Sequence, residues 1–517
     1  MINLQNQRLE LLQKLDAAKT RQERNKMGQF ATPPRVADEI VAYALQQVCK
    51  QEIRYLEPGF GTGAFYTSLL REVQTSREIT EARGYEIDPY YAEPVQQLMA
   101  STPLDLRLQD FTEAKPEPFD IVLCNPPYVR HHHLESSKKI ALSQQIGAQY
   151  GIKTTGLTGL YNYFMMQGEA WLSDVGISAW LVPSEFLDVN YGVAVKKFLL
   201  QNVVLTRIHL FESEDVQFDD ALVSSAVVWY KKGKAPAEHT IELSYGGSLL
   251  HPTHSRQALH RTMDAQDKWT RQIKSGVDRS TSTRTTREHF VLKDFFDVKR
   301  GLATGDNGFF ILNEQQIEAH QLPANVLTPV LPSPRYLKGE IVTSSAKGIP
   351  TNVDRLFLLN CRQTPDVLES NYPKVWEYLK SGIGTVSEKF LARNRKLWYL
   401  QESRDPAPIL CTYMGRGPKD SNTPFRFILN ESKAVATNSF LMLYPKPFWR
   451  IQAANDPHLM RRVWEILSSI TTADMIAEGR TYGGGLEKIE PSELGNVPVG
   501  QLAELLKLMA NPLLEVV

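Results

Sequence analysis

The chain has 517 residues, of which 42% are hydrophobic and 22% charged, so it is an ordinary globular protein with more residues than one typical core holds. Lys and Arg total 58, and Asp and Glu also total 58, which excludes attraction of an anionic partner through net charge. A nucleic-acid-binding protein of this composition would need to gather its basic residues on one face.

The four cysteines are far apart and form no Cys-x-x-Cys pair. This pattern indicates buried thiols in a reducing compartment and argues against a disulfide framework or a zinc site. No apolar run reaches the roughly 20 residues of a membrane span, and the N-terminus lacks the apolar segment of a signal peptide. We therefore expect a cytoplasmic protein with no membrane partner.

The first elements expected in the chain are two helices. Residues 1–26 have apolar residues at roughly helical spacing, and Gly28 follows as a helix stop. Thr32 is a favourable N-cap and Pro33 suits the first helical position, so a second helix is predicted to begin there. A helix start explains Thr32 and Pro33 but gives Phe30 no role.

A short strand over residues 53–56 runs into Glu57 and a loop that contains Gly59, Gly61 and Gly63. Glycines let the backbone turn tightly and approach a ligand, and a predicted helix follows directly. The loop lacks the spacing of dinucleotide-binding loops and the lysine of phosphate-binding loops. The acid at the strand end favours a ligand with a cationic or hydroxylated group.

Two more predicted strands end in acidic residues. Glu86 ends the next strand and follows Gly63 at about the 20-residue distance at which an acid binds ribose in nucleotide-binding α/β folds. Residues 106–111 form a third strand that ends in Asp110 and Phe111. An acceptor beside an aromatic ring suits the amine and the ring of an adenine.

The fourth strand, residues 119–124, is wholly apolar or β-prone except for one aspartate, and it leads into Asn125-Pro126-Pro127-Tyr128. The two prolines make the turn rigid and hold the asparagine amide at the carboxyl edge of the sheet, where open α/β sheets bind ligands. An amide oxygen and backbone carbonyls accept hydrogens from an –NH2 group, and a tyrosine ring can stack. The turn is therefore predicted to hold a planar amine such as a nucleobase.

The alternation of strands and helices predicts a parallel, doubly wound sheet. We expect an N-terminal helix over 1–26, a catalytic domain over 27–240, a linker or basic loop over 241–290, with Arg271 to Arg287 as its basic stretch, and a second domain over 291–517. That second domain has short predicted strands, such as 355–359 and 440–444, and predicted helices near 374–380 and 456–469. His131, His132 and His133 have no carboxylate or cysteine at ligand spacing, so no metal site is expected.

These motifs, in this order, resemble the gamma-class N6-adenine DNA methyltransferases of type II restriction–modification systems, the class of the TaqI methyltransferase. The resemblance rests on residues 30–33, 57–63, Glu86, Asp110-Phe111 and 125–128, and three later segments are similar to family patterns of the target-recognition domain: residues 298–307, 395–399 and 483–491. It implies a Rossmann-like doubly wound methyltransferase domain followed by a mixed α+β target-recognition domain.

The resemblance also implies S-adenosylmethionine as cofactor and assigns roles to residues. Glu86 and Ile87 would bind the cofactor, with Glu86 on the ribose hydroxyls. The other residues expected to bind the cofactor are Phe30 and Thr32 at its methionine end, Glu57, Gly59, Gly61 and Gly63 in the loop, and Asp110 with Phe111 at its adenine.

The resemblance further implies that the target adenine is flipped out of the duplex. The side-chain oxygen of Asn125 and the carbonyl of Pro126, held by the rigid Pro126-Pro127 pair, would accept the N6 hydrogens. Tyr128 would stack on the flipped base, and Tyr191, with Phe186 as the alternative, would supply a second aromatic ring.

Double-stranded DNA is thus the expected partner, in the cytoplasm of a prokaryote, with a cognate restriction endonuclease that acts on the same site as a separate chain. Two alternatives remain open. The first is a methyltransferase of a protein glutamine or an RNA base, although such enzymes usually lack a long second domain. The second is a modification subunit that needs a separate specificity chain, although such subunits usually carry a helical N-terminal domain and no recognition domain.

Overall fold

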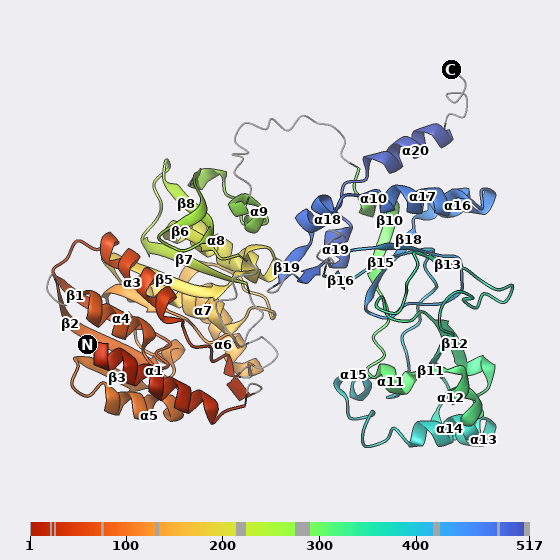
Figure 1. The fold of residues 1–517 in the computed structure, drawn as a ribbon, viewed down its shortest axis with the longest axis horizontal. Helices are drawn as coiled ribbons and strands as arrows, with labels where there is room; N and C mark the ends of the chain where they lie inside the picture. The colour runs from red at the N-terminus through yellow and green to blue at the C-terminus, as the bar shows by residue number, and fades with distance from the viewer. Residues whose placement is uncertain are drawn as a thin grey trace. The chain divides into compact units, whose positions relative to one another are not determined.

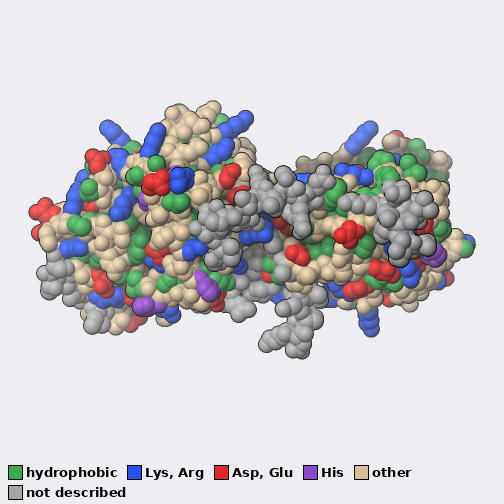
Figure 2. Space-filling view, turned by 90° about the horizontal axis from the view of Figure 1, so that it is seen from above, with side chains coloured by type: hydrophobic (Ala, Val, Ile, Leu, Met, Phe, Trp, Pro, Cys, Tyr) green, Lys and Arg blue, Asp and Glu red, His purple; other side chains and the backbone are tan. Residues whose placement is uncertain are grey.

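The computed structural model describes residues 2–20, 23–24, 27–73, 77–129, 134–212, 224–274, 290–416, 424–482 and 486–510 (Figure 1). The chain forms two compact units, one of residues 1–283 with 482–484 and the other of residues 284–481 and 485–517. In the part of the chain described, no helix is long and apolar enough to cross a membrane. Basic and acidic side chains are interspersed on the face of each unit shown in Figure 2.

The first unit is built on a sheet whose described strands lie in the order β3-β2-β1-β4-β5-β7-β6-β8-β9. The pairs β1–β2, β2–β3, β1–β4 and β4–β5 are parallel, and β7 runs antiparallel to both β5 and β6. The strands are β1 (Glu52–Glu57), β2 (Glu78–Glu86), β3 (Leu104–Leu108), β4 (Phe119–Cys124), β5 (Leu172–Pro183), β6 (Val203–Leu210), β7 (Ser225–Lys232), β8 (Thr240–Gly247) and β9 (Pro252–Leu259).

The strand order reverses between β1 and β4. From β1 the chain moves outward to β2 and β3, and it then returns to the other side of β1 with β4. A crevice forms at the carboxyl ends of strands at such a reversal, because the connecting segments leave in opposite directions. Every residue of β4 is buried, as a central parallel strand covered on both faces requires.

The helices of the first unit pack around this sheet (Figure 1). Helix α1 contacts α4 and α5, α3 contacts α4 and β5, and α6 contacts α7. The helices are α1 (Ile2–Ala17), α3 (Pro34–Gln47), α4 (Ala64–Glu72), α5 (Pro89–Leu98), α6 (Ser136–Tyr150), α7 (Leu160–Gln167), α8 (Val193–Gln201) and α9 (Trp269–Lys274). The fold is the doubly wound, Rossmann-like fold predicted from the sequence.

Two local predictions need correction. Helix α1 ends at Ala17, well before the expected end at residue 26. Helix α3 begins at Pro34, its N-cap position is Pro33, and no side chain caps it. The hydroxyl of Thr32 instead accepts a hydrogen bond from the Asn125 side chain at 3.1 Å, and this tertiary contact replaces the expected cap.

The expected linker over 241–290 is also wrong in its first part. Strand β8 pairs in parallel with β6, β9 pairs antiparallel with β8, and both belong to the large sheet. Trp269 and Ile273 of α9 are buried in the core of the same unit. Alternating apolar residues in β8 bury one face and extend the sheet beyond the predicted boundary at 240. Residues 275–289, which include most of the Arg271 to Arg287 stretch, lie outside the described residues.

The second unit is mixed α+β, as predicted. Its described strands form sheets in the orders β10-β18-β15-β17-β13, β11-β14-β12 and β16-β20-β19. The strands are β10 (Phe296–Arg300), β11 (Ile311–Asn313), β12 (Leu327–Val330), β13 (Ile341–Val342), β14 (Leu356–Leu359), β15 (Ile409–Thr412), β16 (Met414–Gly415), β17 (Phe427–Asn430), β18 (Phe440–Pro445), β19 (Arg480–Tyr482) and β20 (Leu486–Lys488).

Short helices connect and cover these sheets. They are α10 (Leu292–Phe295), α11 (Asn307–Phe310), α12 (Glu314–Ala319), α13 (Pro365–Asn371), α14 (Pro373–Lys380), α15 (Phe390–Arg393), α16 (Pro447–Asn455), α17 (Leu459–Ser468), α18 (Thr472–Glu478), α19 (Pro491–Leu494) and α20 (Gly500–Ala510). Two apolar clusters lie on opposite faces of the sheet β10-β18-β15-β17-β13, because successive residues of β15, β17 and β18 alternate between them. A third cluster packs around β11, β14 and β12.

Candidate cofactor pocket and Asn-Pro-Pro-Tyr turn

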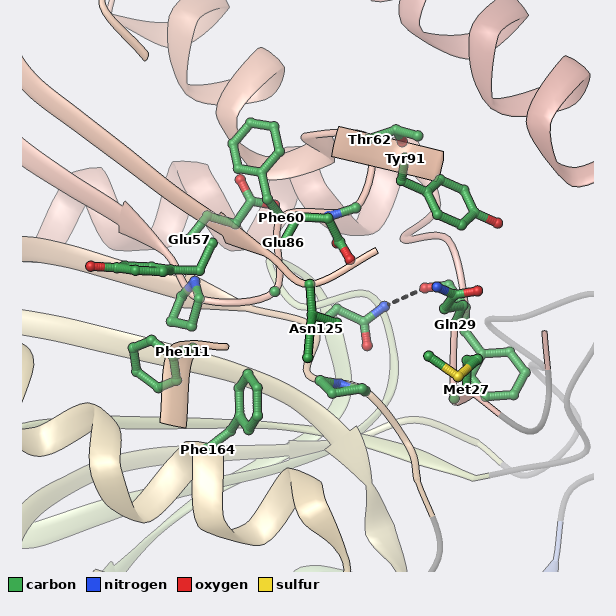
Figure 3. A pocket seen from close by; sticks show the side chains of 18 of the residues that line it. Met27, Gln29, Glu57, Phe60, Thr62, Glu86, Tyr91, Phe111, Asn125 and Phe164 are labelled. Carbon is green, nitrogen blue, oxygen red and sulfur yellow. Dashed lines mark hydrogen bonds between the residues drawn. The ribbon is translucent and has the colours of Figure 1, made fainter. Parts of the chain in front are cut away.

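A pocket lies at the carboxyl ends of β1, β2, β3 and β4, at the reversal of strand order (Figure 3). Residues 27–32 and side chains from α1, α6 and α7 complete its wall. The structure therefore brings together residues that are far apart in sequence. Of the predicted site residues, the lining includes Phe30, Thr32, Glu57, Gly59, Gly61, Glu86, Ile87, Asp110, Phe111, Asn125 and Pro127.

Glu57 is the last residue of β1, at the carboxyl end of the strand, and it is almost fully buried. Its Oε2 accepts hydrogen bonds from the Tyr55 hydroxyl at 2.7 Å and from the Tyr66 N–H at 3.1 Å. Burial raises the pKa of Glu57 from its ordinary value of 4.5 to about 8, and these hydrogen bonds and nearby Arg8 oppose that rise. A carboxyl group at this position can accept a hydrogen bond from a polar ligand in the pocket and, when protonated, donate one.

The glycine loop differs in one detail from the prediction. Gly63 does not line the pocket, although its φ of +76° is in the left-handed region. A Cβ atom at this position would lie 2.6 Å from the ring of Phe60. Phe60 does line the pocket. Gly63 therefore affects the pocket indirectly, because the absence of a side chain leaves room for the Phe60 ring.

Glu86 joins the loop to the end of β2. One carboxylate oxygen accepts from the Gly61 N–H and the other from the Asp88 N–H, each at 2.9 Å. Burial raises the pKa of Glu86, and the two backbone hydrogen bonds oppose this shift. Ile87 next to it lines the pocket with 57% of its side-chain surface exposed, which offers an apolar contact to a ligand.

Asp110 has a partner that the sequence did not suggest. Its carboxylate accepts from the ammonium of Lys138 on α6 and from the N–H and hydroxyl of Thr112, at 2.9 and 2.7 Å. Burial acts to raise the pKa of Asp110, but the hydrogen bonds from Lys138 and Thr112 outweigh it and lower the pKa. Asp110 is therefore an ionised acceptor that shares its charge with a lysine at the pocket wall.

Aromatic rings form the lower wall of the pocket in Figure 3. The ring of Phe111 lies 5.1 Å from that of Phe164 and 5.1 Å from that of Trp171. Phe164 on α7 lines the pocket and was not predicted, because residues 160–167 are mostly apolar and signal only a buried helix. Phe111 and Phe164 present neighbouring surfaces on which a planar ring can pack.

Asn125 is fixed by two hydrogen bonds to the segment before α3. Its Nδ2 donates to the Phe30 carbonyl at 2.8 Å and to the Thr32 hydroxyl at 3.1 Å. Because a carbonyl can only accept, the –NH2 group must face Phe30, and the orientation of the amide is determined. Oδ1 is buried and has no hydrogen-bond partner among the residues described. The side chain thus presents one vacant acceptor beside the pocket.

Tyr128 is buried behind this turn and does not line the pocket. Its hydroxyl donates to the Leu181 carbonyl at 3.1 Å and its N–H to the Gly28 carbonyl at 3.0 Å. Its ring lies 5.4 Å from the ring of Phe30, with the planes at 39°. Phe30, which a helix start could not explain, therefore packs on the Asn-Pro-Pro-Tyr turn.

Neither Tyr191 nor Phe186, the two candidates for the second aromatic residue, lines the pocket. Tyr191 is half-buried, donates from its hydroxyl to Glu185 Oε2 at 3.0 Å, and does not line the pocket. Phe186 has no exposed surface, so it has no face to offer a ligand. Pro126 is also buried and absent from the lining, whereas its neighbour Pro127 belongs to it.

Helix α1 forms a part of the wall that sequence reasoning missed. Leu12 and Asp16 line the pocket, and Arg8, which is fully buried, donates to the Thr62 hydroxyl at 3.2 Å. Thr62 lies in the glycine loop, so this bond ties α1 to the loop. The sequence signal for this role was the charged Arg8 among the apolar positions of the helix.

Within the described residues, no group of three or more His, Cys, Asp or Glu side chains is placed to hold a metal ion. His131, His132 and His133 lie outside the described residues.

We predict that Glu57→Gln removes a pH-dependent loss of stability. Because the folded-state pKa of Glu57 is raised to about 8, its stabilising contribution is complete below pH 4.5 and is lost as the pH rises through 8. Gln keeps an oxygen for Tyr55 but cannot ionise. The melting temperature of the variant should therefore rise relative to wild type between pH 5 and pH 9, measured by calorimetry without cofactor. Parallel curves for the two proteins would show that Glu57 does not titrate in this range.

Family profiles match both halves of the chain. The profile of the Eco57I restriction-modification methylase matches residues 77–217, and that of the C-terminal domain of the type II methyltransferase M.Eco57I matches residues 266–515. Type II methyltransferase M.AccI of Acinetobacter calcoaceticus is 25% identical over 488 residues, which are 91% of this chain and 85% of M.AccI. Type II methyltransferase M.XamI of Xanthomonas campestris pv. amaranthicola is 25% identical over 501 residues, covering 92% and 86%.

Among solved structures, the Type IIL restriction-modification enzyme MmeI in complex with DNA is similar in fold, with a TM-score of 0.51 and 12% sequence identity. The similarity covers 95% of this chain and 66% of that one. By the sequence of both halves and by its fold, the chain is an S-adenosylmethionine-dependent methyltransferase of the type II restriction–modification family.

Proposed function

We propose that this methyltransferase modifies a specific site in duplex DNA by transferring the methyl group of S-adenosylmethionine to N6 of an adenine. The observation that carries the proposal is the vacant Oδ1 of Asn125. A buried acceptor without a partner costs about 1–3 kcal/mol, and an amine hydrogen of a bound base would remove that cost.

The chemistry requires acceptors on both hydrogens of the amine. The N6 lone pair of adenine is delocalised into the ring, and hydrogen bonds from both N–H groups localise it toward the methyl donor. Asn125 supplies one acceptor, and the carbonyl of Pro126 is the proposed second. The prolines hold both at fixed positions, so the acceptors need no reorganisation when charge develops on the nitrogen.

The adenine must leave the double helix to reach this turn. Asn125 Oδ1 is buried and lies at the edge of the cofactor pocket, so a base stacked in duplex DNA cannot approach it. We infer that the base is flipped out, at a cost of a few kcal/mol in lost stacking and pairing. Tyr128 and Tyr191 are the proposed stacking residues, although both need to turn or be uncovered to face a base.

In the cofactor pocket, Glu86 and Ile87 are proposed to hold the ribose, and Asp110 the adenine amine. The methionine end would lie near Phe30 and Thr32, which anchor Asn125, so cofactor and acceptor are positioned by the same segment. Glu57, Gly59 and Gly61 are the proposed backbone and carboxyl contacts of the loop, with Gly63 acting through Phe60. Asp110 would have to share its acceptors between the cofactor and Lys138.

We infer that the chain is the modification half of its system and that a separate endonuclease chain acts on the same site. The relatives M.AccI and M.XamI, which it matches along most of their length, are named as methyltransferases alone. Incubation of the purified chain with unmodified DNA and Mg²⁺ should leave the DNA uncut.

The proposal is tested by identifying which base of the DNA is methylated. The chain is expressed in a host without its own DNA methyltransferases, and the plasmid DNA is digested to nucleosides and analysed by mass spectrometry, with Asn125→Ala as the control. N6-methyldeoxyadenosine is expected. N4-methyldeoxycytidine or 5-methyldeoxycytidine would overturn the adenine assignment, and methyl label found on RNA or protein would overturn DNA as the substrate.

A further inference from the structure

Two segments of the second unit that are similar to family patterns, residues 298–307 and 395–399, are in contact with each other. The guanidinium of Arg395 donates to the carbonyls of Ala303 at 2.7 Å and Thr304 at 2.9 Å. The Lys389 ammonium donates to Asp306 at 2.5 Å. The segment 389–396, which contains helix α15, is thereby fixed to the loop 301–307. Helices α15 and α11 accordingly lie side by side in Figure 1.

This segment is well anchored on its inner side. Ala392 is fully buried, and the Asn394 side chain donates to the Phe390 carbonyl at 2.7 Å. A Cβ atom on Gly305, whose φ is +87°, would lie 3.4 Å from Cβ of Leu391, so helix and loop are in close contact. The exposed side chains of α15 are therefore held in a fixed position on the second unit.

The outer side of α15 is apolar. Phe390 exposes 72% of its surface, the largest value for a large hydrophobic residue in the described chain, and Leu391 beside it exposes 41%. The two neighbouring side chains leave apolar surface in water, and contact with an apolar partner would remove that surface from water.

The surroundings of this apolar tip are basic. Residues 380–396 contain five Lys and Arg residues and one Glu. Arg393 and Lys396 are exposed, and neither forms an ion pair with any described residue, in contrast to Lys389. Free cations beside an exposed apolar tip match a partner that offers phosphates around an apolar interior.

We propose that Phe390 and Leu391 form a wedge that enters the base stack of duplex DNA, while Arg393 and Lys396 contact the flanking phosphates. Apolar side chains that insert between base steps unstack them and kink the duplex. The inference rests on duplex DNA as the substrate. It adds that the second unit weakens the stack, which lowers the cost of extruding the target base.

The wedge is tested with a duplex that carries the site found by methylation mapping, and with the same duplex mismatched opposite the target base. Phe390→Ala should lower methyl transfer on the matched duplex by about 10- to 100-fold. It should lower transfer on the mismatched duplex by less than about threefold, because a mismatched base is already easier to extrude. Cofactor affinity, measured by calorimetry, should stay at the wild-type value.

Val367→Ala is the control. Val367 is an exposed apolar side chain of the same unit, on α13 between Asp366 and Glu369, where phosphates are repelled. It should behave as wild type on both duplexes. The double variant Arg393→Gln, Lys396→Gln should reduce the slope of log affinity against log salt concentration by about 2, since each phosphate contact contributes about 0.9.

The proposed function and the wedge fail in different measurements. Absence of transfer to either duplex by the wild-type chain would overturn DNA as the substrate. Wild-type transfer with normal Phe390→Ala activity would overturn only the wedge. A loss in Phe390→Ala of the same size on both duplexes would also overturn the wedge, because an effect on folding alone is blind to the mismatch.

Discussion

Asn125→Ala is expected to lower the rate of methyl transfer by about 100- to 1000-fold, the range for removal of one preorganised hydrogen-bonding group at a reacting centre. The variant lacks Oδ1 of Asn125, the side-chain acceptor proposed for the amine. The Pro126 carbonyl alone would hold one hydrogen and leave the lone pair largely delocalised.

The rest of the protein should tolerate this change. Asn125 is half-buried, and the hydrogen bonds that it loses go to Phe30 and Thr32 within the same unit. Cofactor affinity by calorimetry and duplex affinity by fluorescence anisotropy should therefore change by less than about tenfold. The assay follows tritium from labelled cofactor to duplex DNA. Transfer at more than a tenth of the wild-type rate would rule out the proposed acceptor.

Thr32→Val is the matched comparison for Asn125. It removes the weaker of the two anchors, at 3.1 Å, and leaves the bond to the Phe30 carbonyl at 2.8 Å. The amide keeps its orientation, so transfer should fall by only about 3- to 10-fold, consistent with one neutral hydrogen bond of about 1 kcal/mol. Equal losses in the two variants would indicate that Asn125 acts only through the conformation of residues 30–32.

Gly28→Ala is expected to lower transfer by about 100-fold, although Gly28 bears no functional group. Its φ is +66°, and a Cβ atom there would lie 2.4 Å from the Tyr128 backbone nitrogen. Backbone atoms cannot move aside as a flexible side chain can, so the Asn-Pro-Pro-Tyr turn must shift. A displacement of about 1 Å in a reacting centre typically costs about 100-fold in rate.

Gly151→Ala separates the shift of the turn from simple backbone strain. Gly151 ends α6 with a φ of +69°, and nothing lies within 4 Å of an added Cβ atom. Both substitutions incur the cost of a left-handed residue, about 1–2 kcal/mol, and both should lower the melting temperature by a few degrees. Only Gly28→Ala should impair transfer. If Gly151→Ala lost as much activity, the close contact with Tyr128 would not be the cause.

Local sequence determined the framework of this protein. The alternation of strands and helices predicted the doubly wound sheet, and the residue at the end of each strand predicted the wall of the pocket. Glu57, Glu86, Asp110 and Asn125 all meet there. This was possible because parallel strands of a doubly wound sheet place their carboxyl ends at one edge, so position along the chain is enough. The short strands β14 and β18 were predicted from local apolar runs.

Tertiary structure alone decided the contacts that give these residues their properties. Thr32 anchors Asn125 instead of capping a helix, Lys138 neutralises Asp110, and Arg395 fixes α15 to the loop 301–307. The same holds for β8 and β9, whose place in the sheet moved the domain boundary. Each of these depends on a hydrogen bond or pairing between segments that are distant in sequence. Local sequence determines on which strand, helix or loop a residue lies. The packing of these elements determines which distant residue its side chain contacts.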